Sequence, residues 1–415
     1  MANFKNYRCT ICHQTFAPEM PIETCPNCGE KGVLDIEYDY QAIKQHVNHA
    51  YFANNHDYSM WRYAPLMSIA PDHIAEMLRI GWTPLVNSRR MREELGLKAL
   101  YIKDEGLNPS GSTKDRASGV AVLKAMEAGK DTISCSSTGN AASSCACQAA
   151  HMGLKAVIFV PKRAPIGKLT QLSIYGATVI CVDGDYKDTF QLSRAAINQY
   201  HWYNRNAAIN PHLVEGKKTV ALEIAEQLNF KPTDWVAVSV GDGCTLAGVY
   251  KGFYDLYQLG LIAKIPRILG VQSAGCAPFY EAYINHAPLK EAEENTIADS
   301  IAVGIPRNPI KALNAINASH GAWITVTDEE ILFMMAKLGR LEGIFGEPAG
   351  VAALAGIEKA VHTGMININE TVTFIMTGNG LKDPVNAQKV ISPPVLLKAD
   401  IELLNDYLKE KGVTK

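Results

Sequence analysis

A lysine behind a loop of small residues is the first candidate for chemistry. Residues 106–118 read GLNPSGSTKDRAS, and Gly106 and Gly111 have the spacing of the two glycines in a phosphate-binding P-loop. A P-loop places its lysine directly after the second glycine, whereas here Ser112 and Thr113 come before Lys114. Taken alone, the stretch is either a polar turn with a solvated lysine or a lysine placed for another purpose, such as bonding to a carbonyl group.

Three further loops follow predicted strands and open predicted helices. They read SSTGN at 136–140, VGDGCTLAG at 240–248 and TGNG at 377–380. In open α/β sheets, ligands bind outside the carboxyl ends of the strands, where such loops lie. Each loop alone is typical of an ordinary helix start, but the four loops together supply different parts of one ligand site.

The parts correspond to those of pyridoxal 5'-phosphate and an amino acid. Amides at a helix N-terminus bind a phosphate or a carboxylate, and a lysine amine bonds to an aldehyde. The phosphate is predicted to contact Gly241, Asp242, Gly243, Cys244 and Thr245, and the substrate carboxylate Ser137, Thr138, Gly139 and Ala141. Asn140 and Thr377 could serve the hydroxyl and the nitrogen of the pyridine ring, which leaves Lys114 for the aldehyde.

The N-terminus carries a separate pattern that is typical of a metal site. Cys9 and Cys12 form one C-x-x-C pair, and Cys25 and Cys28 form a second pair twelve residues later. Two such pairs suit tetrahedral thiolate coordination of zinc, with each pair in a tight turn. Because all four positions are protein ligands, the predicted zinc ion is structural, and it replaces the hydrophobic core that about 35 residues are too few to build.

Composition and charge exclude several classes of function. The chain has 415 residues, a formal net charge of −2 and 47% hydrophobic residues, which is ordinary for a globular protein of two or three domains. This charge argues against a nucleic-acid partner. No apolar run approaches the roughly 18 residues of a membrane span, and the first residues lack the apolar core of a signal peptide. We therefore expect a cytoplasmic protein with no membrane or nucleic-acid partner.

The loops must be positioned by alternating strands and helices, which predict an α/β fold. Strand-like and helix-like segments alternate twice along the chain, as in parallel sheets covered on both faces. We expect two open, twisted, mostly parallel sheets flanked by helices, with a small N-terminal zinc ribbon. The predicted boundaries are 1–38 for the ribbon, 39–96 for a connector to the large domain, 97–205 for a smaller α/β domain with Lys114, 206–395 for the large α/β domain with the phosphate loop, and 396–415 for a C-terminal helix.

The motifs resemble the threonine synthase family, in the fold type II group of pyridoxal-phosphate enzymes. The resemblance rests on KDEGLNPSGSTKDR (103–116), STGN (137–140), EGIFGEPAG (342–350) and TGNGLKDP (377–384), and it covers roughly residues 60–390. It implies that Lys114 is the Schiff-base lysine and general base, that Asn140 bonds the ring hydroxyl, and that Thr377 faces the ring nitrogen. It also implies a lyase of amino-acid metabolism that acts on a small amino acid. We expect a homodimer.

One segment departs from the family and leaves the substrate open. Family members carry Asn-Ser and then arginine where this chain has Ala207, Ala208 and Leu213. In those family members, the Asn, Ser and arginine bind a substrate phosphate. Either other cations replace them (Lys103, Arg116, Lys217, Lys218) and the substrate is O-phosphohomoserine, or the substrate has no phosphate. The second case implies β-elimination, β-replacement or another carbanion reaction. A remote alternative is a catalytically silent interaction protein with a zinc ribbon.

Overall fold

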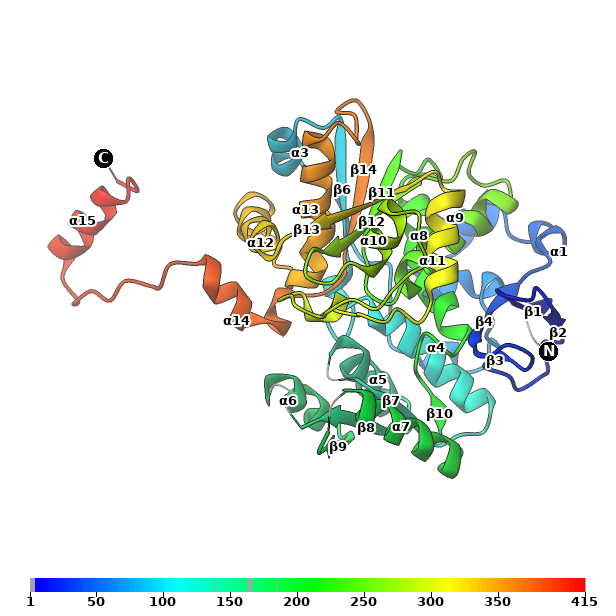
Figure 1. The fold of residues 1–415 in the computed structure, drawn as a ribbon. Coiled ribbons are helices and arrows are strands. Elements are labelled where there is room, and N and C mark those ends of the chain that lie inside the picture. The colour runs from blue at the N-terminus through cyan, green and yellow to red at the C-terminus, as the bar shows by residue number, and fades with distance from the viewer. Residues whose placement is uncertain (1–3, 138, 163–165, 185, 415) are drawn as a thin grey trace.

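The computed structural model describes residues 4–137, 139–162, 166–184 and 186–414 (Figure 1). The chain begins with a small antiparallel sheet of order β2-β1-β4-β3, which we call the ribbon, residues 4–38. Its strands are β1 (Asn6–Cys9), β2 (Thr15–Phe16), β3 (Thr24–Cys25) and β4 (Gly29–Glu37). Tyr7, Leu34 and Ile36 are buried in its own small core. A connector of short helices follows, with α1 (Tyr40–Lys44), α2 (His49–Asn54), η1 (Met60–Leu66) and η2 (Ile74–Glu76).

A six-stranded sheet of order β13-β12-β11-β14-β6-β5 forms the larger body. All neighbouring pairs are parallel except β5 with β6, which is antiparallel. The strands are β5 (Leu85–Asn87), β6 (Ala99–Asp104), β11 (Trp235–Ser239), β12 (Arg267–Ser273), β13 (Ala322–Val326) and β14 (Thr371–Met376). Because side chains of a strand alternate between faces, β11 contributes Val236 and Val238 to one core and Trp235 and Ala237 to another.

Helices cover both faces of this sheet, as strands with apolar side chains on both faces require (Figure 1). The first core is closed by α4 (Lys114–Glu127), α8 (His212–Gln227), α9 (Cys244–Gln258), α10 (Pro278–Ile284) and α11 (Pro309–Ala318). The second core is closed by α3 (Arg90–Leu95), α12 (Asp328–Glu342) and α13 (Pro348–His362).

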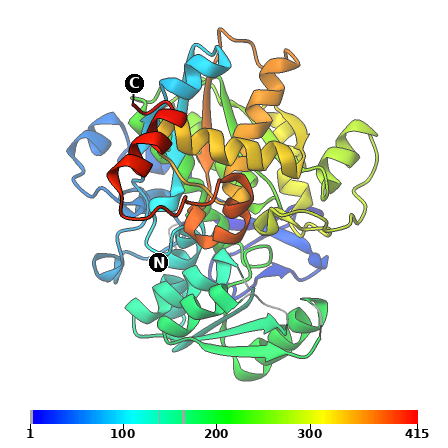
Figure 2. The ribbon, with the colours of Figure 1, turned by 90° about the vertical axis from the view of Figure 1, so that its left-hand side faces the viewer.

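A four-stranded parallel sheet of order β10-β7-β8-β9 forms the smaller body, below the larger one in Figure 2. Its strands are β7 (Thr132–Ser136), β8 (Lys155–Pro161), β9 (Thr178–Val182) and β10 (Tyr203–Asn204). Its helices are α5 (Asn140–His151), α6 (Ile166–Ile174) and α7 (Tyr186–Tyr200). Two parallel sheets flanked by helices agree with the expected fold class.

One expected boundary needs correction. We expected residues 97–205 to form the smaller α/β unit, but β6 pairs with β14 of the six-stranded sheet along its whole length, from Ala99 opposite Thr371 to Asp104 opposite Met376. Leu100 and Ile102 are fully buried in the second core of the larger body, which explains why β6 belongs there. The strands of the smaller sheet span only 132–204, and α4 carries the chain from one body to the other.

The C-terminal residues extend away from both bodies (Figure 1). After η5 (Gly380–Lys382), α14 (Pro384–Ala387) and η6 (Gln388–Val390), the chain ends in α15 (Ile401–Glu410), which lies inside the predicted helical region 396–415 and buries none of its residues. In the described part of the chain, none of the helices has the length and hydropathy that crossing a membrane requires.

Candidate active site

A cavity of about 1430 Å³ lies between the two bodies, at the carboxyl ends of β7, β11 and β14. It is larger than the roughly 300–1,000 Å³ of most small-molecule sites, so that two ligands fit side by side. Every described residue that the sequence predicted for the site lines this cavity: Lys114, Ser137, Gly139, Asn140, Ala141, Gly241, Asp242, Gly243, Cys244, Thr245 and Thr377. The remaining predicted residue, Thr138, lies outside the described residues.

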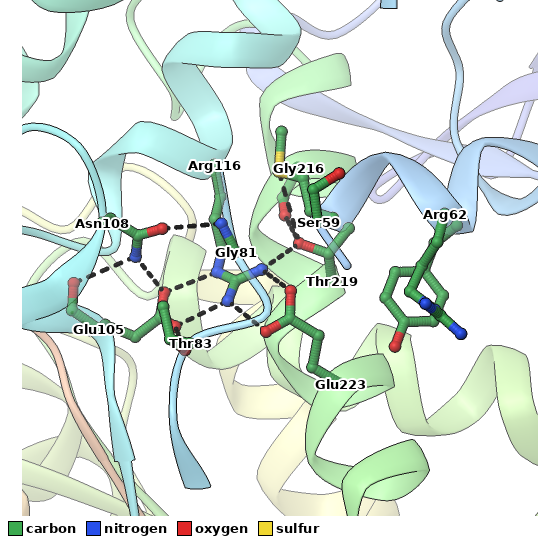
Figure 3. Close-up of polar contacts among 12 residues, drawn as sticks. Ser59, Arg62, Gly81, Thr83, Glu105, Asn108, Arg116, Gly216, Thr219 and Glu223 are labelled. Atoms are coloured by element: carbon green, nitrogen blue, oxygen red, sulfur yellow. Dashed lines mark hydrogen bonds and ion pairs between the residues drawn. The ribbon is translucent and has the colours of Figure 1, made fainter. Parts of the chain in front are cut away.

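A buried ionic network holds the start of α4, where Lys114 lies (Figure 3). Arg116 is completely buried, and its guanidinium forms two-pronged contacts with Glu105 at 2.6 and 2.7 Å and with Glu223 at 2.6 and 2.8 Å. Lys103 Nζ lies 2.7 Å from Glu223 Oε2, so that two buried cations face two buried carboxylates. Burial by itself would lower the pKa of Arg116, but Glu105 and Glu223 outweigh it and raise that pKa.

The loop before Lys114 is tied to the loop after β14. Thr113 N donates to Thr377 O at 2.9 Å, and Asn379 N donates to Gly111 O at 3.0 Å. Gly111 has a φ of +84°, a conformation that glycine adopts without strain. These bonds fix Lys114 and Thr377 on neighbouring walls of the cavity.

The Lys114 amine has an unusual electrostatic environment. Burial, together with the nearby cations Lys217 and Arg205, lowers its pKa from 10.5 to about 8, and the acids Glu347 and Asp242 offset only part of this lowering. Within the described ranges, Nζ of Lys114 has no hydrogen-bond or ion-pair partner. An amine that titrates near neutral pH is suited to hold and release a proton.

Arg205 and Lys217 are the cations of the cavity wall, and both are buried, with exposed fractions of 2% and 4%. Arg205 donates to Ser118 Oγ at 2.9 Å and to Lys114 O at 3.4 Å. Among the described residues, neither cation pairs with a carboxylate. Sequence reasoning did not identify Arg205. The only sequence feature that could have indicated a site residue here is that Arg205 directly follows β10, at the carboxyl end of a strand of the smaller sheet.

The other cations considered from the sequence do not serve the cavity. Lys103 and Arg116 belong to the buried network, and Lys218, on α8, is paired with Glu215 and Asp255. Leu213 is fully buried in the first core and does not line the cavity, although Ala207 and Ala208 do. An apolar residue at position 213 therefore does not leave the cavity without positive charge.

Asn140 is oriented by an acid, Glu347, to which the sequence motifs gave no role. Its Nδ2 donates to Glu347 Oε1 at 2.6 Å, and Glu347 lines the cavity with only 4% exposure. Because a carboxylate accepts and does not donate, the amide nitrogen of Asn140 must face Glu347. Glu347 stands directly before Pro348, at the N-cap of α13, and Glu347 N donates to Gly378 O at 3.0 Å.

The loop before α9 fits a phosphate. Gly243 is the N-cap of this 15-residue helix and has a φ of +84°, and a Cβ at this position would lie 2.7 Å from Ala312 Cβ. The first amides of a helix have no partners within it, which makes the loop a site for an anion. The acid in the loop, Asp242, lines the cavity and accepts a hydrogen bond from Arg307 N at 3.4 Å through its Oδ1. A half-buried amine, two buried cations and this loop together suit a phosphate-bearing aldehyde such as pyridoxal phosphate.

The four N-terminal cysteines also come together. The Sγ atoms of Cys9, Cys12, Cys25 and Cys28 all lie within 4.8 Å of one another, and those of Cys12 and Cys25 are 3.7 Å apart. Four sulfurs at about 2.3 Å from a tetrahedral zinc ion are separated by about 3.8 Å. An added Cβ on Gly32 would lie 2.6 Å from Cys25 Cβ, so only glycine fits beside the cluster without displacing it.

Comparison with known proteins agrees with this chemistry. Residues 77–378 match the family described as pyridoxal-phosphate dependent enzyme. The threonine synthases of Methanosarcina acetivorans and Methanocaldococcus jannaschii are each 38% identical over 408 residues, which cover 98% and 97% of this chain and 99% of each relative. The solved diaminopropionate ammonia lyase of Escherichia coli, 21% identical, has the same fold with a TM-score of 0.66 over 81% of this chain and 93% of its own. The chain is therefore a pyridoxal-phosphate-dependent lyase that belongs to the threonine synthase family.

Proposed function

We propose that this enzyme converts O-phosphohomoserine and water to L-threonine and phosphate. The observation that carries the proposal is Arg205, a cavity-lining guanidinium that is 2% exposed and has only a hydroxyl and a backbone carbonyl as partners among the described residues. An unpaired buried cation costs several kcal/mol, which an anionic ligand offsets. The phosphate of the cofactor is assigned to the separate loop 241–245, so that Arg205 is left for a second phosphate. The name of the two long relatives, threonine synthase, supports the same substrate.

The residues of the cavity would have separate roles in binding such a substrate and in moving its proton. When bound, pyridoxal phosphate withdraws electrons from the α-carbon of an amino acid attached to it. Lys114 would hold the aldehyde carbon between turnovers and would move the proton at the α-carbon, which its pKa of about 8 favours. The amides and hydroxyls of residues 137–141 would bind the substrate carboxylate at the N-terminus of α5.

The ring of the cofactor would lie between Asn140 and Thr377. Asn140, held by Glu347, would hydrogen-bond the ring hydroxyl, and the hydroxyl of Thr377 would face the ring nitrogen. A neutral hydroxyl does not keep that nitrogen protonated as a carboxylate would. As the partner of that nitrogen, Thr377 would limit the negative charge that the bound ring can take up, which would favour loss of the leaving group over side reactions. Arg205 and Lys217 would stabilise the departing phosphate through charge-assisted hydrogen bonds.

The substrate is tested by comparing two products. We expect the purified enzyme to release phosphate from O-phosphohomoserine with a kcat/KM above about 10⁴ M⁻¹s⁻¹, as is ordinary for an enzyme on its own substrate. It should release little ammonia from serine or threonine. Ammonia release that exceeds phosphate release would favour a β-eliminating enzyme with a substrate that carries no phosphate.

Arg205 gives a more specific test. Replacing Arg205 by Met removes about two charge-assisted hydrogen bonds, each worth about 1.5–3 kcal/mol, and should lower kcat/KM for O-phosphohomoserine by about 100-fold or more. The visible absorbance of the bound cofactor should persist. Arg205→Lys should recover part of the loss, and Arg92→Met, at a half-exposed position on α3, should have no effect. An Arg205→Met enzyme with wild-type kinetics would remove Arg205 from the phosphate site.

We also propose that the cysteine cluster binds one structural zinc ion. The sulfur separations support tetrahedral coordination, and four protein thiolates leave no open position for catalysis. Metal analysis should give about one zinc per chain. Cys12→Ser should lower the metal content and the stability of the ribbon, while Cys181→Ser, at another exposed cysteine, should change neither. Full zinc content in Cys12→Ser would contradict the assignment.

A further inference from the structure

The ribbon reaches the wall of the catalytic cavity through one side chain. Glu23 Oε2 accepts a hydrogen bond of 2.8 Å from Asn204 Nδ2, a contact between residues 181 positions apart. Asn204 ends β10 of the smaller sheet and is only 6% exposed. A carboxylate acceptor makes this bond stronger than one between neutral groups.

Asn204 connects Glu23 to the cavity wall through further hydrogen bonds. Its Oδ1 accepts from Asn206 N at 3.0 Å and from Asn206 Nδ2 at 2.8 Å, and its backbone oxygen accepts from Asn210 Nδ2 at 3.0 Å. Asn206 lines the cavity together with Arg205, Ala207, Ala208 and Ile209. Since Glu23 fixes which way the Asn204 amide faces, it also fixes the turn at 204–210 that carries Arg205.

The ribbon is anchored on the larger body as well. Asp35 Oδ1 lies 3.1 Å from Lys251 Nζ on α9 and 3.2 Å from Lys311 Nζ on α11. At the start of α8, Tyr7 Oη lies 3.0 Å from His212 Nε2. The ribbon therefore joins both bodies, between which the cavity lies, and limits how the wall at 204–210 can move relative to α8 and α9.

The local sequence explains how the ribbon contacts the smaller body. Glu23 precedes Cys25 by two residues, and Glu30, which forms an exposed ion pair with Arg194 at the cavity rim, follows Cys28 by two. Both contacts thus come from the turn around the second C-x-x-C pair. The exposed pair contributes little in water, so Glu23 carries the coupling.

We propose that Glu23 is a positioning residue for the substrate site, and that the ribbon is a functional part of this site as well as a separate folded unit. Glu23 acts through Asn204 to hold the 204–210 turn in the conformation that binds substrate. This goes beyond the reaction proposed above, because it concerns the wall and not the identity of the substrate.

The test compares Glu23→Ala with Glu23→Gln, whose amide oxygen still accepts from Asn204. Hydrogen exchange of the 203–212 backbone should be about tenfold faster in Glu23→Ala than in wild type, as loss of one buried hydrogen bond implies, and near wild type in Glu23→Gln. KM for O-phosphohomoserine should rise about tenfold in Glu23→Ala, with kcat within about twofold. Glu37→Gln, which breaks only the exposed pair with Arg8 on the ribbon, is the matched control.

Each outcome decides the proposal. Unchanged exchange and KM in Glu23→Ala, or equal effects of Ala and Gln, would overturn it. If Glu23→Ala loses the ribbon fold, Asn204→Asp tests the same bond from the other side, since it keeps the oxygen that accepts from Asn206 and loses the donor to Glu23. Slow 203–212 exchange in that variant would overturn the proposal too. The exchange measurement needs no substrate, so it stands even if the enzyme proves not to use O-phosphohomoserine.

Discussion

The buried network around Arg116 is the constraint on which the site depends. It joins the end of β6 through Lys103 and Glu105, the start of α4 through Arg116, and α8 through Glu223. Removing one member of such a buried set leaves an uncompensated charge, at a cost of about 3–5 kcal/mol. Lys114 stands two residues before Arg116, so the network that fixes the helix also aims the lysine into the cavity. Close approach of α4 and α8 requires Gly216, where an added Cβ would lie 2.2 Å from Arg116 O.

The same residue types serve opposite purposes in this protein. Arg116, Lys103 and Lys218 are buried with carboxylate partners and hold the fold together. Arg205 and Lys217 are buried without such partners among the described residues, and they are suited to bind an anion that arrives from solution. They also lower the pKa of Lys114, because two nearby cations disfavour the protonated form of its amine. The same two cations thus give the cavity wall its positive charge and, together with burial, lower the pKa of the Lys114 amine.

Much of the site could be predicted from local sequence. Loops at the carboxyl ends of strands meet at one edge of a sheet, so Lys114, Asn140, Gly243 and Thr377 were expected to come together, and they line one cavity. The cysteine cluster was equally predictable, since its spacing determines its geometry. The membership of β6 could not be predicted, because parallel strands of either sheet have the same apolar pattern.

The rest of the site depends on contacts between distant residues. A sequence pattern does not tell that Arg116 is neutralised by Glu223 while Arg205 is not, that Leu213 turns into the core, or that Glu23 meets Asn204. These facts decide which cations are available to a substrate. Fold and cofactor were accordingly predictable from motifs, whereas the substrate wall required the three-dimensional structure.

The most direct measurement of the central claim is to locate the lysine that holds the cofactor. Borohydride reduction of the purified holoenzyme, followed by peptide mapping, attaches a pyridoxyl group permanently to the lysine that bonds it. We predict this group on Lys114, the amine that the Arg116 network aims into the cavity. A pyridoxyl group on Lys217 or Lys103 would contradict it.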